Sequence, residues 1–177
     1  MIRLTSSQNP IIKEVRALKN KSEREERGLY FIEGARFVSE ALKEPTDIKY
    51  FVVSETFSSD EGNAPLIAAV SDSPAQCYVV PDRLFDSISD TKTPQGVLAV
   101  IKLAKKGLKG MKLPRGLLVV LDSIQDPGNM GTIIRTADAA GCAAVIVPEG
   151  CVDVFNPKVL RSTMGSLFHV PVYFAQS

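Results

Sequence analysis

The sequence of 177 residues predicts an α/β protein built from two parts joined by a basic linker. Helix-type and strand-type hydrophobic patterns alternate through residues 1–101, which predicts an α/β sandwich. The run GLLVVLD, residues 116–122, is almost entirely apolar and is followed by a helix pattern and a second apolar run, as in a parallel βαβ unit. Between these parts, residues 102–115 contain six Lys or Arg, no Asp or Glu, two glycines and one proline. That composition is typical of a linker between domains.

The elements of the first part follow from residue spacing. A helix is predicted over residues 9–20, with Asn9 as its N-cap and Pro10 at its first position. Further helices are expected over residues 34–42, 64–70 and 82–88, where apolar residues recur at helical spacing. Short apolar runs predict strands over residues 29–33, 49–54, 77–81 and 96–101.

The second part, residues 116–177, predicts fewer elements. Strands are expected near residues 117–121, 143–147 and 171–174, with helices over residues 129–140 and 156–166 between them. A parallel sheet is normally covered on both faces and has more strands than three. We therefore expect residues 116–177 to be an incomplete domain of marginal independent stability.

Composition excludes several classes of protein. Hydrophobic residues make up 45% and charged residues 23% of the chain, as in soluble globular proteins. The chain contains neither an apolar run of membrane-spanning length nor an N-terminal signal-peptide pattern. One histidine, His169, excludes a histidine-based metal cluster, and we expect it to be structural. The three cysteines, without a CxxC pair, predict reduced and mostly buried thiols in a cytoplasmic protein.

The charge is unevenly distributed although the net charge is only +1. Besides the linker, residues 1–37 are basic, with eight Lys or Arg against five Asp or Glu. Such asymmetry favours a polyanionic partner, and we select Lys13, Arg16 and Arg36 as candidate RNA-binding residues. The alternative is a solvated helix of mixed charge, which the local sequence EREER at residues 23–27 favours.

The loop DPGNMG, residues 126–131, lies after a predicted buried strand and opens a predicted helix. In open parallel sheets ligands bind at this position, although the alternative is a tight turn with Asn129 as a helix cap. Asn129, Thr132 and Arg135 are spaced to share one exposed side of the helix. Its packed side is expected to contain Ile133, Ile134, Ala137 and Ala140. Arg135 is a candidate for binding phosphate or ribose, or else an ordinary solvated arginine.

A second polar group occurs in NPKVLRSTMG, residues 156–165. Lys158, Arg161 and Ser162 are candidate RNA-binding residues on one short helix. The alternatives are that Asn156 is an N-cap before Pro157 and that Arg161 interacts with the helix dipole. The glycine-rich fingerprints GxGxxG and GxxxxGK[ST] do not occur, which argues against a doubly wound nucleotide-binding domain.

These segments together resemble a known family. NMGTIIRTADAAG resembles motif 1 of the SpoU (TrmH-type) branch of the SPOUT RNA methyltransferases, which reads N-x-G-x-x-x-R-x-A. Asn129, Gly131, Arg135 and Ala137 match it position for position. NPKVLRSTMGSLFHVPV is similar to a later segment of that family. The N-terminal segments SSQNPIIKEVRALKNKSEREERGLYFIEGARFVSEAL and TPQGVLAV resemble its L30e-like substrate-binding domain, here residues 1–101.

The resemblance implies transfer of a methyl group from S-adenosylmethionine to a ribose 2′-hydroxyl of ribosomal or transfer RNA. It implies catalytic roles for Arg135 and Asn129, structured RNA as partner, no membrane, and a homodimer. The family's cofactor motifs do not occur in the chain, so cofactor-binding residues are unknown and are expected beyond Ser177. The chain thus resembles an N-terminal portion of such an enzyme, inactive alone. The alternative function is a non-catalytic RNA-binding module.

Overall fold

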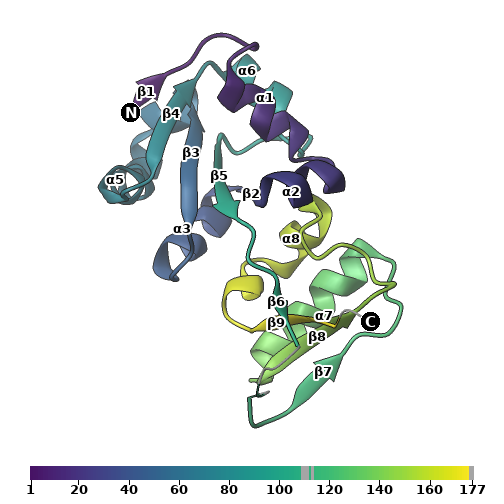
Figure 1. Ribbon diagram of the computed structural model, residues 1–177. Helices are drawn as coiled ribbons and strands as arrows, with labels where there is room; N and C mark the ends of the chain where they lie inside the picture. The colour runs from purple at the N-terminus through teal and green to yellow at the C-terminus, as the bar shows by residue number, and fades with distance from the viewer. Residues whose placement is uncertain (109–111, 113, 176–177) are drawn as a thin grey trace. The chain divides into compact units, whose positions relative to one another are not determined.

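The computed structural model describes residues 1–108, 112 and 114–175 and divides the chain into two compact units, Met1–Leu103 and Ala104–Ser177 (Figure 1). The first unit contains one five-stranded sheet in the order β1-β4-β3-β5-β2. Its strands are β1 (Ile2–Arg3), β2 (Leu29–Glu33), β3 (Ile48–Ser54), β4 (Gln76–Val80) and β5 (Val97–Lys102). β1, β4 and β3 are parallel, whereas β5 runs antiparallel to both β3 and β2.

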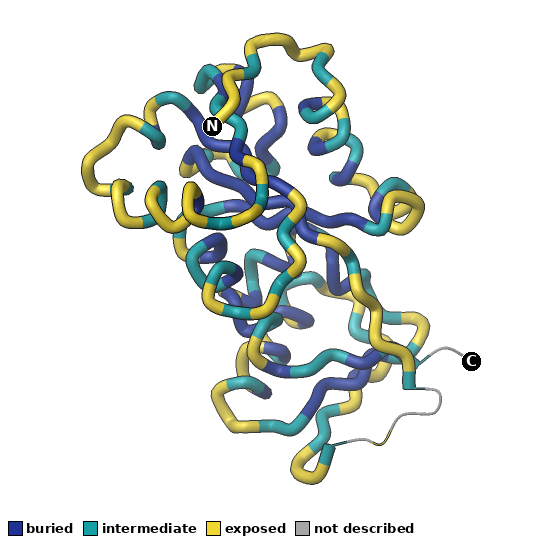
Figure 2. The backbone as a smooth tube through the Cα atoms, turned by 60° about the vertical axis from the view of Figure 1, so that its left-hand side comes forward, coloured by how far each residue is buried: buried dark blue, intermediate teal, exposed yellow. Residues whose placement is uncertain are grey.

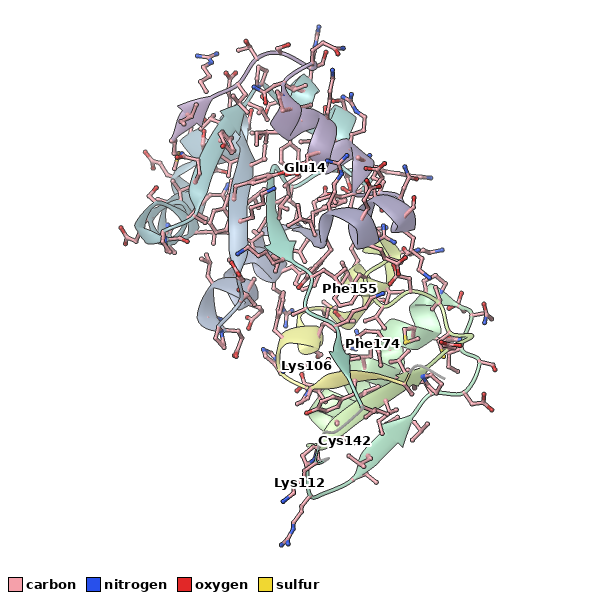
Figure 3. All side chains as sticks on the ribbon, viewed as in Figure 1. Glu14, Lys106, Lys112, Cys142, Phe155 and Phe174 are labelled. Carbon is pink, nitrogen blue, oxygen red and sulfur yellow. The ribbon has the colours of Figure 1, made fainter. Side chains whose placement is uncertain are left out.

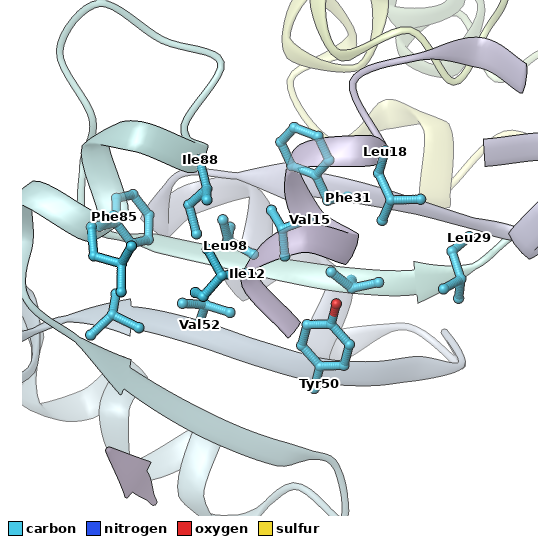
Figure 4. Close-up of a cluster of buried hydrophobic side chains, with 13 residues drawn as sticks. Ile12, Val15, Leu18, Leu29, Phe31, Tyr50, Val52, Phe85, Ile88 and Leu98 are labelled. Atoms are coloured by element: carbon cyan, nitrogen blue, oxygen red, sulfur yellow. The ribbon is translucent and has the colours of Figure 1, made fainter. Parts of the chain in front are cut away.

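The helices of the first unit cover both faces of this sheet. They are α1 (Pro10–Ala17), α2 (Lys21–Arg27), α3 (Ala35–Lys43), α4 (Glu55–Ser59), η1 (Glu61–Asn63), α5 (Ala64–Asp72) and α6 (Asp82–Ile88). On one face, α1 and α6 bury Ile12, Val15 and Phe85 against the sheet (Figure 4). Strand side chains alternate between faces, so Phe51 and Val53 point to the opposite side, where α3 packs.

The strands and main helices of the first unit confirm the predictions from hydrophobic spacing. The predicted strand at residues 29–33 is β2, and its central residues are among the dark, buried segments of Figure 2. Four elements were not predicted, one of them the short 3-10 helix η1. α2 has the sequence KSEREER, which carries no apolar stripe, and β1 has only two residues. α4 is also short and directly follows β3.

The second unit contains a four-stranded, all-parallel sheet in the order β6-β9-β8-β7. Its elements are β6 (Lys106–Gly107), β7 (Leu118–Val120), α7 (Pro127–Ala139), β8 (Ala144–Pro148), α8 (Pro157–Thr163), η2 (Ser166–Phe168) and β9 (Val172–Ala175). Three strands lie where the sequence predicts them. The fourth, β6, comes from the stretch expected to be a linker, of which residues 109–111 and 113 lie outside the described residues.

An aromatic contact links the loop before α8 to β9, an inner strand of this sheet. The rings of Phe155 and Phe174 are stacked, with centroids 5.9 Å apart (Figure 3). The ammonium group of Lys105 lies 5.8 Å from the centroid of the Phe174 ring. The basic stretch therefore contributes a cation as well as a strand to the second unit.

Candidate functional site

The helix that carries the main candidate residues, α7, begins at Pro127 and is capped by Asp126. The Asp126 carboxylate accepts a hydrogen bond from the backbone N–H of Asn129 at 2.8 Å. The interpretation of Asn129 as the capping side chain is therefore wrong, because that residue is already inside the first turn. Asp126 satisfies one of the free N–H groups of the first turn, and the Asn129 side chain is exposed.

The exposed side of α7 carries the expected polar residues. Asn129, Thr132 and Arg135 are all exposed. The packed side differs from the expectation at one end, since Ala140 is exposed. Met130, Gly131, Ile134 and Ala137 are buried instead. The sequence identified Ile134 and Ala137 correctly but missed Met130 and Gly131, which pack because α8 lies against the start of α7.

The contact between α7 and α8 depends on a glycine. A Cβ atom on Gly131 would lie 1.8 Å from the Ser162 hydroxyl oxygen and 2.8 Å from the Ser162 backbone carbonyl carbon. The Ser162 hydroxyl is 3.0 Å from the Pro127 carbonyl oxygen and 2.9 Å from the Val159 carbonyl oxygen. Ser162, a candidate RNA-binding residue, thus lies half-buried in the helix packing.

The close approach of these helices brings the end of α8 to Arg135. Arg135 donates a hydrogen bond from Nη1 to the sulfur of Met164 at 3.2 Å. Met164 ends α8 in the left-handed conformation, with φ at 52°. The left-handed region costs a non-glycine residue roughly 1–2 kcal/mol. Met164 was not predicted as a site residue, and the only signal in the sequence is its position directly before Gly165.

Asp138 is the acid nearest in sequence to Arg135 on α7, but it does not pair with Arg135. Asp138 lies one turn after Arg135, at a spacing that commonly forms an ion pair. Its Oδ2 atom is instead 3.1 Å from Nδ1 of His169. In the part of the chain that the structure describes, Arg135 therefore has no carboxylate partner, and its full charge faces solvent.

The other candidates on α8 differ in accessibility. Lys158 is exposed and Arg161 is half-buried. The Asn156 side chain accepts a hydrogen bond from the Lys158 backbone N–H at 2.9 Å, which confirms its interpretation as an N-cap. A hydrogen bond or ion pair with Asp138 gives His169 the structural partner that the sequence alone could not identify.

In the first unit, the candidate RNA-binding residues do not form one patch. Lys13 and Arg16 are exposed on α1, and an Arg16 guanidinium nitrogen is 3.1 Å from the Ser87 hydroxyl. Arg36 is exposed in the first turn of α3, which packs on the opposite face of the sheet. Arg24, also in the early basic cluster, is 2% exposed and donates to the carbonyl oxygens of Leu18 and Lys19. It therefore anchors the end of α1.

A buried carboxylate organises the loop beside Arg36. Glu33, at the end of β2, accepts hydrogen bonds from the hydroxyls of Ser89 at 2.5 Å and Thr91 at 2.7 Å. The side chain of Gln95 accepts a hydrogen bond from the Ala35 backbone N–H at 2.8 Å, at the start of α3. This loop and the first turn of α3 therefore form one fixed surface that includes Arg36.

Comparison with protein families accounts for both units. Residues 9–99 match the family model of the MRM3-like substrate binding domain. Residues 116–177 match that of the SpoU rRNA Methylase family. The chain belongs to the SpoU rRNA methylase family. The resemblance noted in motif 1 is thereby confirmed, and Asn129 and Arg135 lie within the matched SpoU segment.

Relatives of this SpoU chain match most of its length and are longer. The chain is 38% identical over 172 residues to the 23S rRNA (guanosine(2553)-2′-O)-methyltransferase RlmP of Bacillus subtilis, covering 97% of this chain and 64% of RlmP. It is 35% identical over 162 residues to human mitochondrial rRNA methyltransferase 3, covering 88% of this chain and 37% of that protein. The chain thus spans less than two thirds of the length of these curated relatives.

Solved structures support the same fold for the SpoU chain. An AdoMet-bound rRNA methyltransferase from Sinorhizobium meliloti matches with a TM-score of 0.83 and 32% identity, covering 98% of this chain and 64% of that structure. The SpoU methyltransferase AviRb from Streptomyces viridochromogenes, also with AdoMet, matches with a TM-score of 0.83 and 25% identity over 96% of this chain and 64% of that structure. Among the described residues no helix is long and apolar enough to span a membrane, and no cluster of His, Cys, Asp or Glu could hold a metal ion.

Proposed function

We propose that this chain belongs to an enzyme that transfers a methyl group from S-adenosylmethionine to a ribose 2′-hydroxyl of ribosomal RNA. The observation that carries the proposal is the state of Arg135. It is exposed on the motif 1 helix, and its one hydrogen-bond partner in the described structure is an uncharged thioether. An arginine held at a fixed place without a counter-ion is available to an anion of the substrate.

The chemistry of guanidinium limits what Arg135 does in this reaction. Arginine remains protonated in proteins, so Arg135 is not a general base. Its planar fork of donors suits a phosphate oxygen next to the target ribose, or the negative charge that develops on the 2′-oxygen. Asn129 lies two turns earlier on the same exposed side of α7, where its amide can bind a ribose or phosphate group.

The residues of the motif 1 helix suit an anion. S-Adenosylmethionine would supply the methyl group from its positively charged sulfonium. Arg135 is a cation, and the start of α7 presents the positive end of a helix dipole. Both would attract an RNA phosphate, and neither would attract the sulfonium. We therefore assign them to the RNA and assign no cofactor-binding residue.

Under this proposal the two parts of the chain have different roles. Residues 1–101 bind structured RNA, residues 102–115 connect, and residues 116–177 contribute the catalytic residues. Arg36, beside its fixed loop, and Lys13 and Arg16 on α1 contact RNA phosphates, as do Lys158 and Arg161 on α8. Ser162 has its role in the packing of α8 and contacts RNA only secondarily. The relatives support ribosomal RNA as the substrate class.

The assembly and location of the enzyme are part of the same proposal. We infer a homodimer that acts in the bacterial cytoplasm. The bacterial relative RlmP supports this location, whereas the human relative is mitochondrial. Sedimentation of the full-length protein tests the dimer.

The test of the proposed function is substitution of Arg135 in the full-length protein. Arg135→Ala removes the only cation assigned to the reacting groups, and we expect methyl transfer to ribosomal RNA to fall by at least about a hundredfold. Arg135→Lys is also expected to be poor, because an ammonium group cannot reproduce the fork of donors. The measurement is incorporation of labelled methyl groups into RNA under single-turnover conditions.

Arg83→Ala is the matched control, since Arg83 is an exposed arginine on α6 of the first unit. It should leave the rate unchanged. Methylation by Arg135→Ala within a few-fold of the unsubstituted protein contradicts the proposed role. RNA binding by the unsubstituted protein without any methylation supports the alternative, a non-catalytic RNA-binding module.

A further inference from the structure

The thioether of Met164 is the hydrogen-bond acceptor that faces the guanidinium of Arg135, at 3.2 Å from Nη1. Resting on the proposed function of Arg135, we propose that Met164 is a positioning residue for methyl transfer. It orients the Arg135 guanidinium toward the RNA without neutralising its charge.

The contact between Arg135 and Met164 results from the close packing of α7 and α8. Gly131 lets α8 approach α7 closely at Ser162, and Arg135 lies one turn further along α7. Met164 lies two residues after Ser162, so the contact between α7 and α8 that begins at Gly131 and Ser162 extends to Arg135 and Met164. The position of Arg135 is therefore tied to the end of α8.

The backbone of Met164 is in the left-handed conformation. Met164 is one of two non-glycine residues with positive φ among the described residues, the other being Ser123. Helices commonly end in this conformation at glycine, and a glycine follows at position 165. A turn alone would be less strained with glycine at position 164. Strained backbone of this kind is concentrated at functional sites, and here it keeps a long side chain directed at Arg135.

The hydrogen-bond acceptor, the sulfur of Met164, is uncharged. A thioether is a weak, uncharged acceptor, so it fixes one nitrogen of the guanidinium and leaves the charge intact. A carboxylate in its place would bind the fork at two points and compete with RNA. Met164 is 46% exposed, a large apolar side chain left at the surface beside the arginine. That exposure is consistent with a residue that contacts a ligand-facing group.

Two variants of the full-length protein test the inference. Met164→Gly suits the left-handed backbone and removes the thioether, so the melting temperature should stay the same or rise. The value of kcat should nevertheless fall by about tenfold, with KM for RNA within about twofold. Met164→Leu keeps the volume and loses the sulfur, and kcat should fall by about threefold. If Met164 only stabilised the fold, its substitution would lower the melting temperature and kcat together.

A second readout does not depend on catalysis. In protein labelled with 13C at the methionine methyl groups, Arg135→Ala should shift the Met164 resonance, whereas Arg83→Ala should not. Wild-type kcat in both Met164 variants, or an unmoved resonance, overturns the inference. If Arg135→Ala is inactive while the Met164 variants are fully active, the proposed function stands and only this inference fails. An active Arg135→Ala protein overturns both.

Discussion

Cys77 on β4 differs from the other two cysteines in its surroundings. It is 4% exposed, whereas Cys142 and Cys151 are half-buried. Burial raises the pKa of the Cys77 thiol from its ordinary value of 9.0 to about 11. The folded protein therefore disfavours the thiolate at this position, and the thiolate is the reactive form.

We predict that Cys77 resists alkylation in the folded protein. At pH 8, a pKa higher by two leaves about one hundredth of the thiolate that an ordinary cysteine has. Peptide mapping after iodoacetamide treatment should find Cys142 and Cys151 modified and Cys77 intact. In urea all three should react alike. Because the folded-state pKa is raised, the associated stability is present below pH 9 and is lost as the pH rises toward 11. Equal rates in the folded protein would contradict the burial of Cys77.

Single residues also show where sequence reasoning stops. The spacing of Asn129, Thr132 and Arg135 was enough to place them on one exposed side of a helix. The partner of His169 could not be found in this way, because Asp138 lies 31 residues earlier and meets it only through the packing of the chain. Met164 was missed for a similar reason, since its direction depends on one backbone angle.

At the scale of elements, the packing of α7 on α8 depends on the missing side chain of Gly131. We predict that Gly131→Ala destabilises the protein by about 1–3 kcal/mol, because the new methyl group overlaps Ser162 and the helices must separate. Urea unfolding measures the change. Gly131→Ala combined with Ser162→Gly should recover only part of it, since a backbone atom of residue 162 also lies in the way.

Gly107→Ala provides the control for this pair of variants. A Cβ atom on Gly107 would meet nothing within 4 Å. The same chemical change there should alter the unfolding free energy by no more than about 0.5 kcal/mol. Equal effects at positions 107 and 131 would mean that α7 and α8 do not touch as described.

The helix starts show which elements a sequence can specify. α1, α7 and α8 each begin with Asn or Asp followed by proline, and in each the first side chain accepts a backbone N–H. The sequence predicts the cap at residues 9 and 156 but not at Asp126, so the predicted helix begins at Asn129, two residues after the start of α7. β6 could not be predicted, because Lys106 and Gly107 become a strand only when β9 pairs with them.

At the scale of the whole molecule, the basic segments are not equally available to RNA. Lys106 and Lys112 in the basic stretch are exposed. Three other lysines are held in ion pairs, Lys43 with Glu40, Lys49 with Glu14, and Lys102 with Asp47. The summed charge of a segment, which the sequence provides, does not distinguish these two kinds of lysine.

We predict that replacing Lys106 and Lys112 together by glutamine weakens RNA binding and its dependence on salt. The slope of log affinity against log salt should become shallower by roughly two, since about that many phosphate contacts are lost. The control replaces Lys43 and Lys49 by glutamine. It removes the same formal charge and should change the slope by less than one. An unchanged slope in the first variant would exclude the basic stretch from the RNA contact.

The sheet order of the first unit has a consequence for how the protein is made. β5 lies between β3 and β2 and is the last of the five strands to be synthesised. While the ribosome adds residues 34–96, β2 has no strand to pair with, and β3, once it is made, lacks its neighbour β5. Both edges stay open to other chains through this interval, when a nascent domain is most prone to aggregate. Insertion of β5 closes them in a single event, so the first unit completes its sheet only when the basic stretch begins to emerge.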